Sequence, residues 1–546
     1  MSEKSAPDCG YIRVHSLFIC RHTHPRLAYS LPLMNILVVG AGVGGATAAA
    51  LLAKAGHRVT LLEAHVYPGG CAGTFFHKGY RFDAGATLAG GFQPGGPHEV
   101  VGSMLGIQWK TRPAEPAWRV HLPDRVITRF GHEANWHAEL ERSFATARDR
   151  AEILRFFLQS ENISDAVWNF AARRPAWPPT SFGDLFRTAA ALRPDTLATL
   201  PLLTQTMGAW ARRSGVRDRA ALTFLNAQLL ISAQTTADNA SALFGAAAAD
   251  LPRKGVNHVE GGIGTLSRQL VDALIAHGGE VHYRQEVTRF EVCGGRIVAA
   301  HTNKGARFAC DAVVANLTPW DFARLLGADS PPTIQRETKR RRDQWGAFTM
   351  YLGIHESDES DKSDKSDKTD AIHPTDPSGI SVEHHQVVAD YDRPLGETNS
   401  VFLSFSMPGD HERAPAGHRA LTISTHTRTA DWWALRDRPD GRQEYEDRVA
   451  MYAETMLTNA ERAVPGLRKR IRLQLEGTPV TFRFYTRRQR GGVGGFPFTS
   501  IFTARGPQTG LPNAWLVGDS IFPGQSTAGV TMGALRVVDD IRRSVR

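Results

Sequence analysis

The stretch "NILVVGAGVGGATAAALLAKAGHRVTLLEA" (residues 35–64) decides the fold of this 546-residue chain. Its pattern predicts a strand over 36–39, a tight turn, a helix over about 44–55 and a second strand over 59–62. The first strand is a continuous apolar run, which is typical of a parallel strand that is buried on both faces. The stretch therefore predicts an α/β fold around a parallel sheet.

The turn between the first strand and the helix carries a phosphate-binding pattern. Gly40, Gly42 and Gly45 have the GxGxxG spacing at the strand-to-helix turn that its mechanism requires. Gly40 permits the tight turn, Gly42 lets the backbone approach a pyrophosphate, and Gly45 lets the helix pack closely on the strand. Glu63 ends the second strand, where a carboxylate accepts the ribose hydroxyls. These features predict a Rossmann-type dinucleotide site, to which we also assign Val43, Gly44 and Ala64.

A second glycine-rich stretch, "GGCAGT" (residues 69–74), follows the predicted ribose acid. A plain NAD-binding unit has no such stretch, so we expect a further loop to contact the same dinucleotide. Its candidate contacts are Gly70, Cys71 and Thr74. Cys71 has three interpretations: a covalent cofactor link, a redox thiol, or a small residue that fills the loop. We favour the last, because no second cysteine is paired with it in the sequence.

A third glycine-rich loop lies at the other end of the chain, in "WLVGDSIFPGQSTAGVTMGALR" (residues 515–536). An apolar run meets Gly518 and Asp519, and a loop rich in Gly, Ser and Thr leads to a predicted helix start near Gly529 and Val530. A helix N-terminus favours negative charge, so this loop is suited to the same phosphate-bearing ligand. We therefore expect the two ends of the chain to meet across one ligand.

These motifs together resemble those of the flavoprotein family that contains the amine oxidases and the carotenoid desaturases. The closer resemblance is to the phytoene desaturase-like branch, and within it to the carotenoid 3,4-desaturases. The stretches that resemble this subgroup are "FDAGATLAGGFQPGGPHE" (82–99), "NAQLLISAQTTADNASALFGAAAADLP" (226–252), "HHQVVADYDRPLGETNSVFLSFS" (384–406) and "RRQRGGVGGFP" (487–497). The resemblance covers most of residues 34–541.

The resemblance implies an FAD cofactor, and it implies that the glycine-rich loops and Glu63 contact this FAD. It implies that Asp519 meets the flavin ribityl chain and that the helix after Gly529 and Val530 faces the isoalloxazine ring. Val287, in "RQEVTRF", matches a valine whose backbone meets the adenine, with plain strand core as an equal alternative.

The segments of nucleotide-binding character are scattered along the chain. Residues 34–110, 252–322 and 476–546 are predicted to form a discontinuous FAD-binding domain. Residues 111–251 carry long helical patterns, and residues 323–475 mix strands and helices. These two segments are predicted to form an α+β substrate domain with a helical part that associates with a membrane.

Two segments are expected to lie outside both domains. Residues 1–33 precede a Met34 that is followed at once by the first strand, which indicates a disordered or mis-called extension. The repeat "ESDESDKSDKSDKTD" (356–370) cannot bury a core and predicts a disordered acidic insertion.

The composition argues against several functions. The formal net charge of +9 is modest at this length and is not concentrated in a block, so a nucleic-acid partner has little support. The five cysteines form no CxxC pair and no zinc spacing, which indicates a reducing compartment and no metal site. The sequence contains no run of about 18 apolar residues, so it predicts no membrane span. We expect a cytoplasmic protein that associates peripherally with a membrane.

Two helical stretches in the predicted substrate domain combine apolar and Arg side chains. Leu203, Met207 and Trp210 share one helical face, at whose end Arg212 and Arg213 lie. A similar cluster contains Trp168, Phe170, Arg173, Arg174 and Trp177. Such faces suit a membrane interface through which a lipophilic substrate enters, and packing between helices is the alternative.

The predicted activity is FAD-dependent desaturation at C3–C4 of an acyclic or one-ended carotenoid. We expect a hydride to pass from the allylic carbon to flavin N5, a proton to be lost, and oxygen or a membrane quinone to accept the electrons. Such chemistry needs positioning and an apolar tunnel more than a strong base, so the sequence names no catalytic residue. His384 and His385 would point to opposite faces of a strand, so at most one of them faces the pocket.

Three alternatives remain open. A carotenoid cis–trans isomerase or a retinol-saturase-like enzyme shares the same frame but works through reduced flavin. A non-enzymatic lipid-binding protein like the Rab GDP-dissociation inhibitors shares the fold without FAD, and the intact Glu63, Gly518 and Asp519 argue against it. An amine oxidase needs an aromatic cage, which the sequence does not locate.

Overall fold

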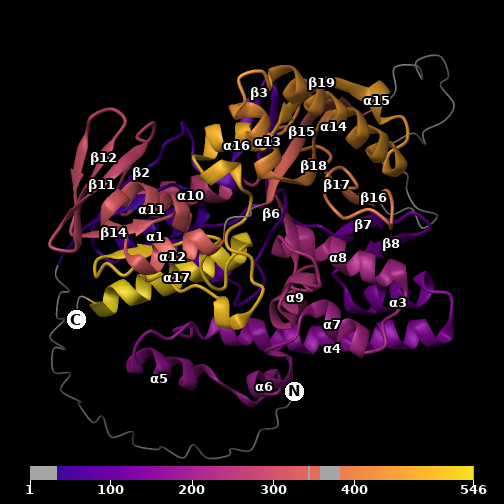
Figure 1. Cartoon of the computed structure of the whole chain (residues 1–546), viewed down its shortest axis with the longest axis horizontal. Helices are drawn as coiled ribbons and strands as arrows, with labels where there is room; N and C mark the ends of the chain where they lie inside the picture. The colour runs from indigo at the N-terminus through magenta and orange to yellow at the C-terminus, as the bar shows by residue number, and fades with distance from the viewer. Residues whose placement is uncertain (1–32, 342–344, 357–381, 545–546) are drawn as a thin grey trace, which may run out of the picture.

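A five-stranded parallel sheet is built around the stretch at 35–64 (Figure 1). The computed structural model describes residues 33–341, 345–356 and 382–544. The sheet has the order β10–β2–β1–β14–β20, and all of its pairings are parallel. Its strands are β1 (Asn35–Val39), β2 (Arg58–Leu62), β10 (Glu280–His282), β14 (Ala312–Ala315) and β20 (Ala514–Leu516). Segments from the beginning, the middle and the end of the described chain therefore lie side by side.

The alternation of residues along β1 explains how both faces of this sheet are covered. Ile36 and Val38 point into a core shared with α1, α10 and α17. Leu37 and Val39 point into the opposite core, which contains the small sheet β11–β12–β13 and α11. Burial on both faces accounts for the continuous apolar run in the sequence. The covering elements are α1 (Val43–Lys54), α10 (Thr265–Ala276), α17 (Thr527–Ser544), β11 (Val287–Cys293), β12 (Arg296–Thr302), β13 (Arg307–Ala309) and α11 (Pro319–Leu326).

A seven-stranded sheet, with the order β19–β15–β18–β17–β16–β7–β8, forms the second half of the molecule. On one face, residues such as Leu352, Leu403 and Ile423 pack against α13 and α14. The elements are β7 (Trp118–His121), β8 (Val126–Arg129), β15 (Trp345–His355), β16 (His384–Val388), β17 (Ser400–Phe405), β18 (His418–Arg428), β19 (Ile471–Gly477), α13 (Thr429–Asp437) and α14 (Arg442–Ala463). The other face of this sheet is a wall of the cavity described below.

A helical layer lies below the seven-stranded sheet in the view of Figure 1. Its helices are α3 (Glu133–Ser143), α4 (Ala147–Ala172), α5 (Phe182–Ala191), α6 (Pro194–Leu197), α7 (Met207–Arg213), α8 (Arg219–Ala233) and α9 (Ala242–Ala249). The helical character predicted for residues 111–251 omits three strands at the start of that segment, β6 (Thr111–Pro113), β7 and β8. These strands were missed because each is only three or four residues long.

The remaining elements are short and connect these layers. They are η1 (Gly70–Ala72), β3 (Thr74–His77), β4 (Tyr80–Asp83), β5 (Ala89–Gly90), α2 (Pro97–Leu105), η2 (Leu200–Leu202), β9 (Val256–Val259), η3 (Gly327–Asp329), α12 (Pro332–Arg340), α15 (Leu467–Arg470), α16 (Pro479–Thr486), η5 (Gln489–Gly491) and η6 (Ile501–Thr503).

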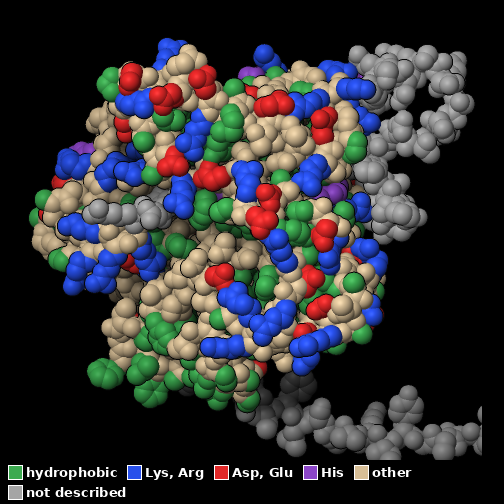
Figure 2. Space-filling view, turned by 45° about the vertical axis from the view of Figure 1, so that its right-hand side comes forward, with side chains coloured by type: hydrophobic (Ala, Val, Ile, Leu, Met, Phe, Trp, Pro, Cys, Tyr) green, Lys and Arg blue, Asp and Glu red, His purple; other side chains and the backbone are tan. Residues whose placement is uncertain are grey.

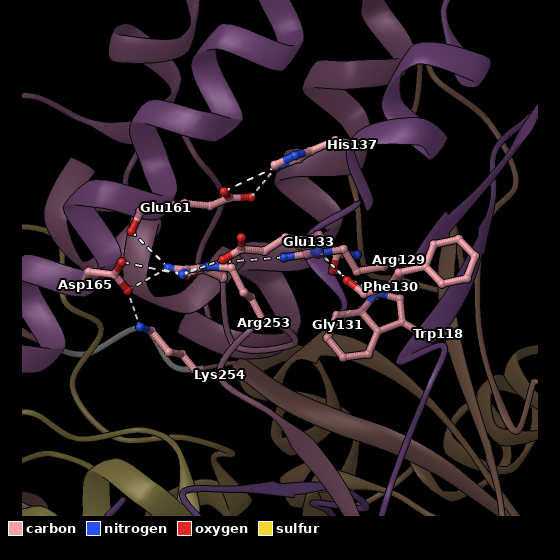
Figure 3. A network of polar contacts seen from close by, with 12 residues as sticks. Trp118, Arg129, Phe130, Gly131, Glu133, His137, Glu161, Asp165, Arg253 and Lys254 are labelled. Carbon is pink, nitrogen blue, oxygen red and sulfur yellow. Dashed lines mark hydrogen bonds and ion pairs between the residues drawn. The ribbon is translucent and has the colours of Figure 1, made fainter. Parts of the chain in front are cut away.

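A buried polar network joins the helical layer to the edge of the seven-stranded sheet (Figure 3). Arg253, just after α9, donates to Asp250 at 2.6 Å, to Asp165 of α4 at 2.7 Å and to the Glu161 carbonyl at 3.0 Å. Arg129, the last residue of edge strand β8, lies 3.6 Å from Asp250, and neither side chain is more than 3% exposed. The network therefore fixes α4 and α9 relative to β8.

The two helical faces considered for a membrane interface are buried instead. Met207 and Trp210 belong to the core of the helical layer, where Trp210 makes an edge contact with Phe156 at 5.0 Å. Phe170 is also buried, and Arg174 pairs with Asp539 of α17 at 2.9 Å. Packing between helices is thus the correct interpretation of both stretches, and their membrane interpretation is wrong.

Within the described residues, no helix is both long and apolar enough to cross a membrane. The predicted extension at 1–33 and the predicted acidic insertion at 356–370 lie outside the described residues, apart from Leu33 and Glu356. The division into an FAD-binding and a substrate domain stays a prediction.

Candidate functional site

A cavity of about 1010 Å³ is lined by residues of both large sheets. Most of the predicted cofactor residues lie on its wall, although they come from distant parts of the chain. These are Gly40, Gly42, Val43, Gly44, Glu63, Ala64, Gly70, Cys71, Val287, Gly518, Asp519 and Val530. Gly45, Thr74 and Gly529 are not among the lining residues.

The first glycine loop presents an open helix N-terminus to this cavity. Gly40 has a φ of +94°, a left-handed conformation that glycine adopts without strain. Gly42 is the N-cap of α1, where no side chain caps the helix and no acidic residue occupies its first turn. The first backbone N–H groups of α1 are thus left for an anion. Gly45 is instead a packing residue, because a Cβ there would lie 2.1 Å from the Gly40 carbonyl oxygen.

Glu63 is held rigidly beside this loop. Its Oε2 accepts a hydrogen bond from the Ala41 N–H at 2.7 Å, and its Oε1 accepts one from the His65 N–H at 2.8 Å. Burial raises the pKa of Glu63, while the hydrogen bonds from the backbone lower it. Each carboxylate oxygen keeps further lone pairs, so the side chain can also accept hydroxyl groups from a ligand in the cavity.

The glycine pair at 69–70 braces the first loop. The Gly69 N–H donates to the Ala41 carbonyl at 2.9 Å, and Gly70 and Cys71 line the cavity. Burial raises the pKa of the Cys71 thiol, which disfavours a reactive thiolate and agrees with a space-filling role. Thr74 has a structural role, because its hydroxyl donates to Asp83 at 2.7 Å and accepts from the Gly264 N–H at 2.8 Å.

The C-terminal loop touches the first glycine loop directly. A Cβ at Gly44 would lie 2.7 Å from Val530 Cγ1 of α17, so the beginning and the end of the chain meet here. Asp519 lines the cavity and forms an ion pair with Arg488 at 2.9 Å. Gly529 is a packing residue, because a Cβ there would lie 2.1 Å from the Gly524 carbonyl oxygen.

The sequence reasoning missed two residues that organise these loops. Asn316, directly after β14, packs against three glycines. A Cβ added to Gly42 would lie 2.5 Å from Asn316 Nδ2, one added to Gly45 would lie 2.9 Å from Asn316 Cβ, and one added to Gly518 would lie 3.0 Å from Asn316 Oδ1. Its position at the carboxyl end of a parallel strand was a usable signal, since ligands of such sheets bind there. Arg488 stands in the quoted stretch "RRQRGGVGGFP", but its pairing with Asp519 is a long-range contact.

The cavity continues from the glycine loops along the open face of the seven-stranded sheet. That wall includes Ala347, Thr349, Phe402, Ser424 and His426. Helix α8 contributes Leu230, Ile231 and Ser232 to the opposite side. A compartment of this kind suits a largely apolar ligand with a few polar contacts.

The two histidines considered as catalysts do not line the cavity. His384 Nδ1 shares a hydrogen bond of 2.8 Å with Ser404 Oγ, and its ring stacks on His258. His385 Nδ1 lies 3.2 Å from His121 Nε2. From the same strand it is Gln386 that faces the cavity. Among the described residues there is no group of three or more His, Cys, Asp or Glu that could hold a metal ion.

The residues around the cavity fit FAD. An uncapped helix N-terminus suits a pyrophosphate, a buried carboxylate with free lone pairs suits a ribose, and a second loop with an acidic side chain closes the same cavity. The neighbouring atoms leave no room for a larger side chain at Gly40, Gly42, Gly44 or Gly45.

Comparisons with known proteins agree with this architecture. Residues 38–104 match the NAD(P)-binding Rossmann-like domain. The fold is similar to that of an oxidoreductase from Methanosarcina mazei, with a TM-score of 0.62, 18% identity and coverage of 93% of this chain and 100% of the other.

Two relatives named for carotenoid chemistry match nearly the whole chain. Prolycopene isomerase 2, chloroplastic, of an Oncidium hybrid cultivar is 28% identical over 93% of this chain and 84% of its own length. Phytoene desaturase (lycopene-forming) of Pantoea ananas is 26% identical over 90% of this chain and 96% of its own. Over most of its length the chain is therefore similar to proteins named for carotenoid desaturation and isomerisation, in agreement with the resemblance of its motifs.

Proposed function

We propose that this protein is an FAD-dependent enzyme that acts on the polyene chain of a carotenoid. The observation that carries the proposal is one continuous cavity, with three glycine-rich loops at one end and a largely apolar compartment at the other. A dinucleotide and an elongated apolar substrate would meet inside it. When bound, the flavin supplies two-electron redox chemistry at the junction of the two parts.

The residues of the chain have distinct roles in this proposal. The N-terminus of α1 binds the pyrophosphate, Glu63 binds the ribose, and Val287 lies against the adenine. Asp519, fixed by Arg488, binds the ribityl chain, and the N-terminal residues of α17 lie beside the flavin ring. The sheet wall and α8 orient the polyene and exclude water from it.

Two reactions are compatible with this arrangement. Desaturation at C3–C4 is the reaction that the sequence motifs favour, and the phytoene desaturase match supports desaturation in general. Cis–trans isomerisation is the second candidate, because a prolycopene isomerase matches 93% of the chain. Loss of a proton from a cation that the polyene delocalises needs no strong base, so both reactions depend on positioning more than on proton abstraction by the protein.

A membrane surface is the proposed source of the substrate. Helix α5 turns Asp184, Thr188 and Ala191 toward the protein and exposes Phe182 by 90% and Phe186 by 82%. We define the apolar patch as Phe182, Leu185, Phe186, Leu192, Leu197 and Leu200, all of which are exposed. Figure 2 shows apolar side chains gathered at the lower edge of the molecule, at the height of α5 in Figure 1.

The chemistry of this patch fits a lipid surface better than a protein partner. Two aromatic side chains one helical turn apart project almost fully into solvent, and the exposed Arg193 lies two residues after the end of α5. Aromatic and basic side chains together are typical of helices that lie in a membrane interface. A carotenoid is dissolved in the membrane, so an enzyme that acts on it needs such a contact.

Co-expression in a carotenoid-producing host tests the proposed function. Desaturation removes two hydrogens from the pigment and shifts its absorbance to longer wavelength, whereas isomerisation leaves the mass unchanged. Lycopene, γ-carotene and their 1-hydroxylated forms are the substrates to supply. An unchanged pigment profile with all of them, from a protein that contains FAD, would show that the proposal is wrong.

A further inference from the structure

Strand β19 leaves one edge of the seven-stranded sheet open. It pairs with β15 on one side, and no described strand lies on its other side. Every second residue of such a strand directs its backbone N–H and C=O groups outward, where they can pair with another strand. After a register shift at Arg472, the pairing with β15 is regular from Leu473 to Gly477. Proteins commonly protect a long open edge with Pro or Lys, and β19 contains neither.

The side chains of β19 alternate between the two faces of the sheet. Arg472, Gln474 and Glu476 are exposed, and the apolar residues between them are partly buried. The Arg472 guanidinium donates to the Lys469 carbonyl at 2.8 Å. Glu476 accepts a hydrogen bond from Gln474 at 2.7 Å and has no cationic partner among the described residues. The exposed face therefore carries one charge of each sign, two residues to either side of Gln474.

This pattern is complementary to itself when the strand is reversed. In an antiparallel pair of two β19 strands centred on Gln474, Arg472 of each copy lies opposite Glu476 of the other. On the inner face, Leu473 of each copy lies opposite Leu475 of the other. Opposite charges and apolar side chains in facing positions stabilise paired strands, and like charges destabilise them. A surface that pairs with its own copy in this way is what a twofold dimer requires.

An exposed aromatic side chain lies beside this edge. Strand β3 is close to β19, because Phe75, Leu473 and Leu475 pack against the same hydrophobic cluster. The next residue, Phe76, points away from that cluster and is 67% exposed. A pair of short strands buries less than the roughly 1,600 Å² of a typical stable interface, so apolar surface next to the edge must contribute. Phe76 is suited to this role, because aromatic residues are enriched in the cores of interfaces.

We propose that β19 is a dimerisation edge, at which two copies of this chain pair antiparallel about Gln474 and join their seven-stranded sheets into one. The hydrocarbon of a membrane is not a suitable occupant, since it offers no partners for backbone N–H and C=O groups. Strand β19 lies near the top of Figure 1 and α5 near the bottom, so the dimer leaves the apolar patch uncovered. The inference goes beyond the proposed function and does not depend on it.

Sedimentation of the whole chain in a mild detergent tests the dimer, because detergent suppresses association through the apolar patch. We expect a reversible dimer in the wild-type protein. Arg472→Glu and Glu476→Arg each place like charges opposite one another at two positions, so each should raise the dimer dissociation constant at least about tenfold. Glu141→Arg makes the same change of charge at an exposed position of α3 and should leave the constant unchanged.

Mixing the two charge-reversed variants separates a specific contact from a general effect on folding. In a mixed dimer of Arg472→Glu with Glu476→Arg, each strand again meets opposite charges at both positions. The equimolar mixture should therefore recover the wild-type affinity, and the double variant Arg472→Glu/Glu476→Arg should dimerise by itself. A variant that had lost its fold would not be repaired by either combination.

A disulfide at the twofold axis tests the register of the two strands. Cα atoms that face each other across an antiparallel pair are about 4.5–5.5 Å apart, which is within the range that a disulfide bridges. Gln474→Cys should therefore cross-link into a covalent dimer under mild oxidation. Arg472→Cys should not, because it faces Glu476 of the second copy, and the wild-type protein controls for the native cysteines.

The outcomes distinguish this inference from the proposed function. A wild-type protein that stays monomeric up to its highest soluble concentration would overturn the dimer, as would a dimer that tolerates both charge reversals or that the mixture does not restore. Cross-linking of Arg472→Cys in place of Gln474→Cys would also overturn the proposed pairing. Because none of these measurements involves the cofactor or a carotenoid, the proposed function stands or fails separately.

Discussion

Arg488 and Asp519 form an ion pair, with 2.9 Å between Arg488 Nη2 and Asp519 Oδ2, on the wall of the cavity. Both side chains are at most 20% exposed, so removal of one partner leaves the other charge largely desolvated. We predict that Asp519→Ala weakens FAD binding at least about tenfold, because it removes the carboxylate that we propose to bind the ribityl chain, and a hydrogen bond to a charged group contributes about 1.5–3 kcal/mol. The ratio of FAD to protein after gel filtration measures this.

A matched control for that variant is Glu337→Ala. Glu337 pairs with Arg505 at 2.8 Å, with similar burial, but neither residue lines the cavity. Its loss should lower stability and leave FAD occupancy unchanged. Normal FAD occupancy in Asp519→Ala would refute the placement of the C-terminal loop at the cofactor.

Gly45 of α1 packs tightly against the preceding turn at Gly40, and this contact predicts the effect of adding a methyl group at Gly45. A Cβ there would lie 2.1 Å from the Gly40 carbonyl oxygen and 2.9 Å from Asn316 Cβ, so Gly45→Ala should destabilise the protein by about 3 kcal/mol and reduce FAD occupancy. Gly183→Ala is the control, because Gly183 also lies near a helix N-terminus and a Cβ there meets only Ser181 Oγ at 3.8 Å. Thermal unfolding of the two variants should differ clearly. Equal melting temperatures would contradict the close packing.

His98 predicts how stability responds to acid. Burial lowers its pKa to about 3, from the ordinary value of 6.5, and both ring nitrogens are buried without a hydrogen-bond partner among the described residues. A depressed pKa means that stability is present above about pH 6.5 and is lost as the pH falls towards 3. We predict that His98→Phe, whose ring can keep the stacking on Phe92, recovers up to ~1.4 kcal/mol of unfolding free energy per pH unit below 6.5.

Denaturant-induced unfolding at pH 7 and pH 5 provides the measurement. His132→Gln serves as the control, because His132 is exposed and its replacement should not change the pH dependence. The same loss of stability between the two pH values in His98→Phe and in the wild-type protein would count against this role of His98.

The apolar patch predicts membrane binding through α5. Replacing Phe182 and Phe186 together by Glu should reduce co-flotation with phosphatidylcholine–phosphatidylglycerol vesicles at least about tenfold, because burial of each ring contributes about 2 kcal/mol. Phe484→Glu is the matched control, since Phe484 is 63% exposed on α16, away from the patch. Undiminished flotation of the double variant would exclude α5 as the contact.

The network of Figure 3 predicts an unequal effect of two charge neutralisations. Asp250 contacts both Arg253 and Arg129, and Asp250→Asn leaves the buried Arg129 guanidinium without its carboxylate, so it should cost about 3 kcal/mol of unfolding free energy. Glu446→Gln breaks an exposed pair with Arg442 and should cost less than about 1 kcal/mol. Urea unfolding compares the two, and similar midpoints would mean that the network contributes little.

The parts of the fold that sequence reasoning predicted well are local. The first strand, the helix and the second strand of the Rossmann-type unit follow from apolar runs and from glycine spacing over 35–64, and the observed bounds differ by a residue. The predictions for Gly40, Glu63 and Asp519 rest on motifs with a mechanism, and all three line one cavity. Whether they bind FAD stays a prediction.

The parts that could not be predicted depend on which element packs against which. The face containing Met207 and Trp210 is amphipathic whether its partner is lipid or another helix, and only the neighbouring Phe156 decides between them. The exposed rings of α5 gave no such signal, because a short helix with two phenylalanines looks like a core element. Asn316 was missed because its contacts with Gly42, Gly45 and Gly518 all join residues that are distant in sequence.

The position of β20 at the edge of the five-stranded sheet has a consequence for biosynthesis. A chain is made from its N-terminus, so β1 and β2 can pair long before residues 514–544 emerge from the ribosome. Until then the first glycine loop lacks Val530 beside it and Arg488 lacks its carboxylate partner. The cofactor site that we propose would therefore be completed only late in maturation, and a nascent chain that stalls before that point would lack it however well its first half had folded.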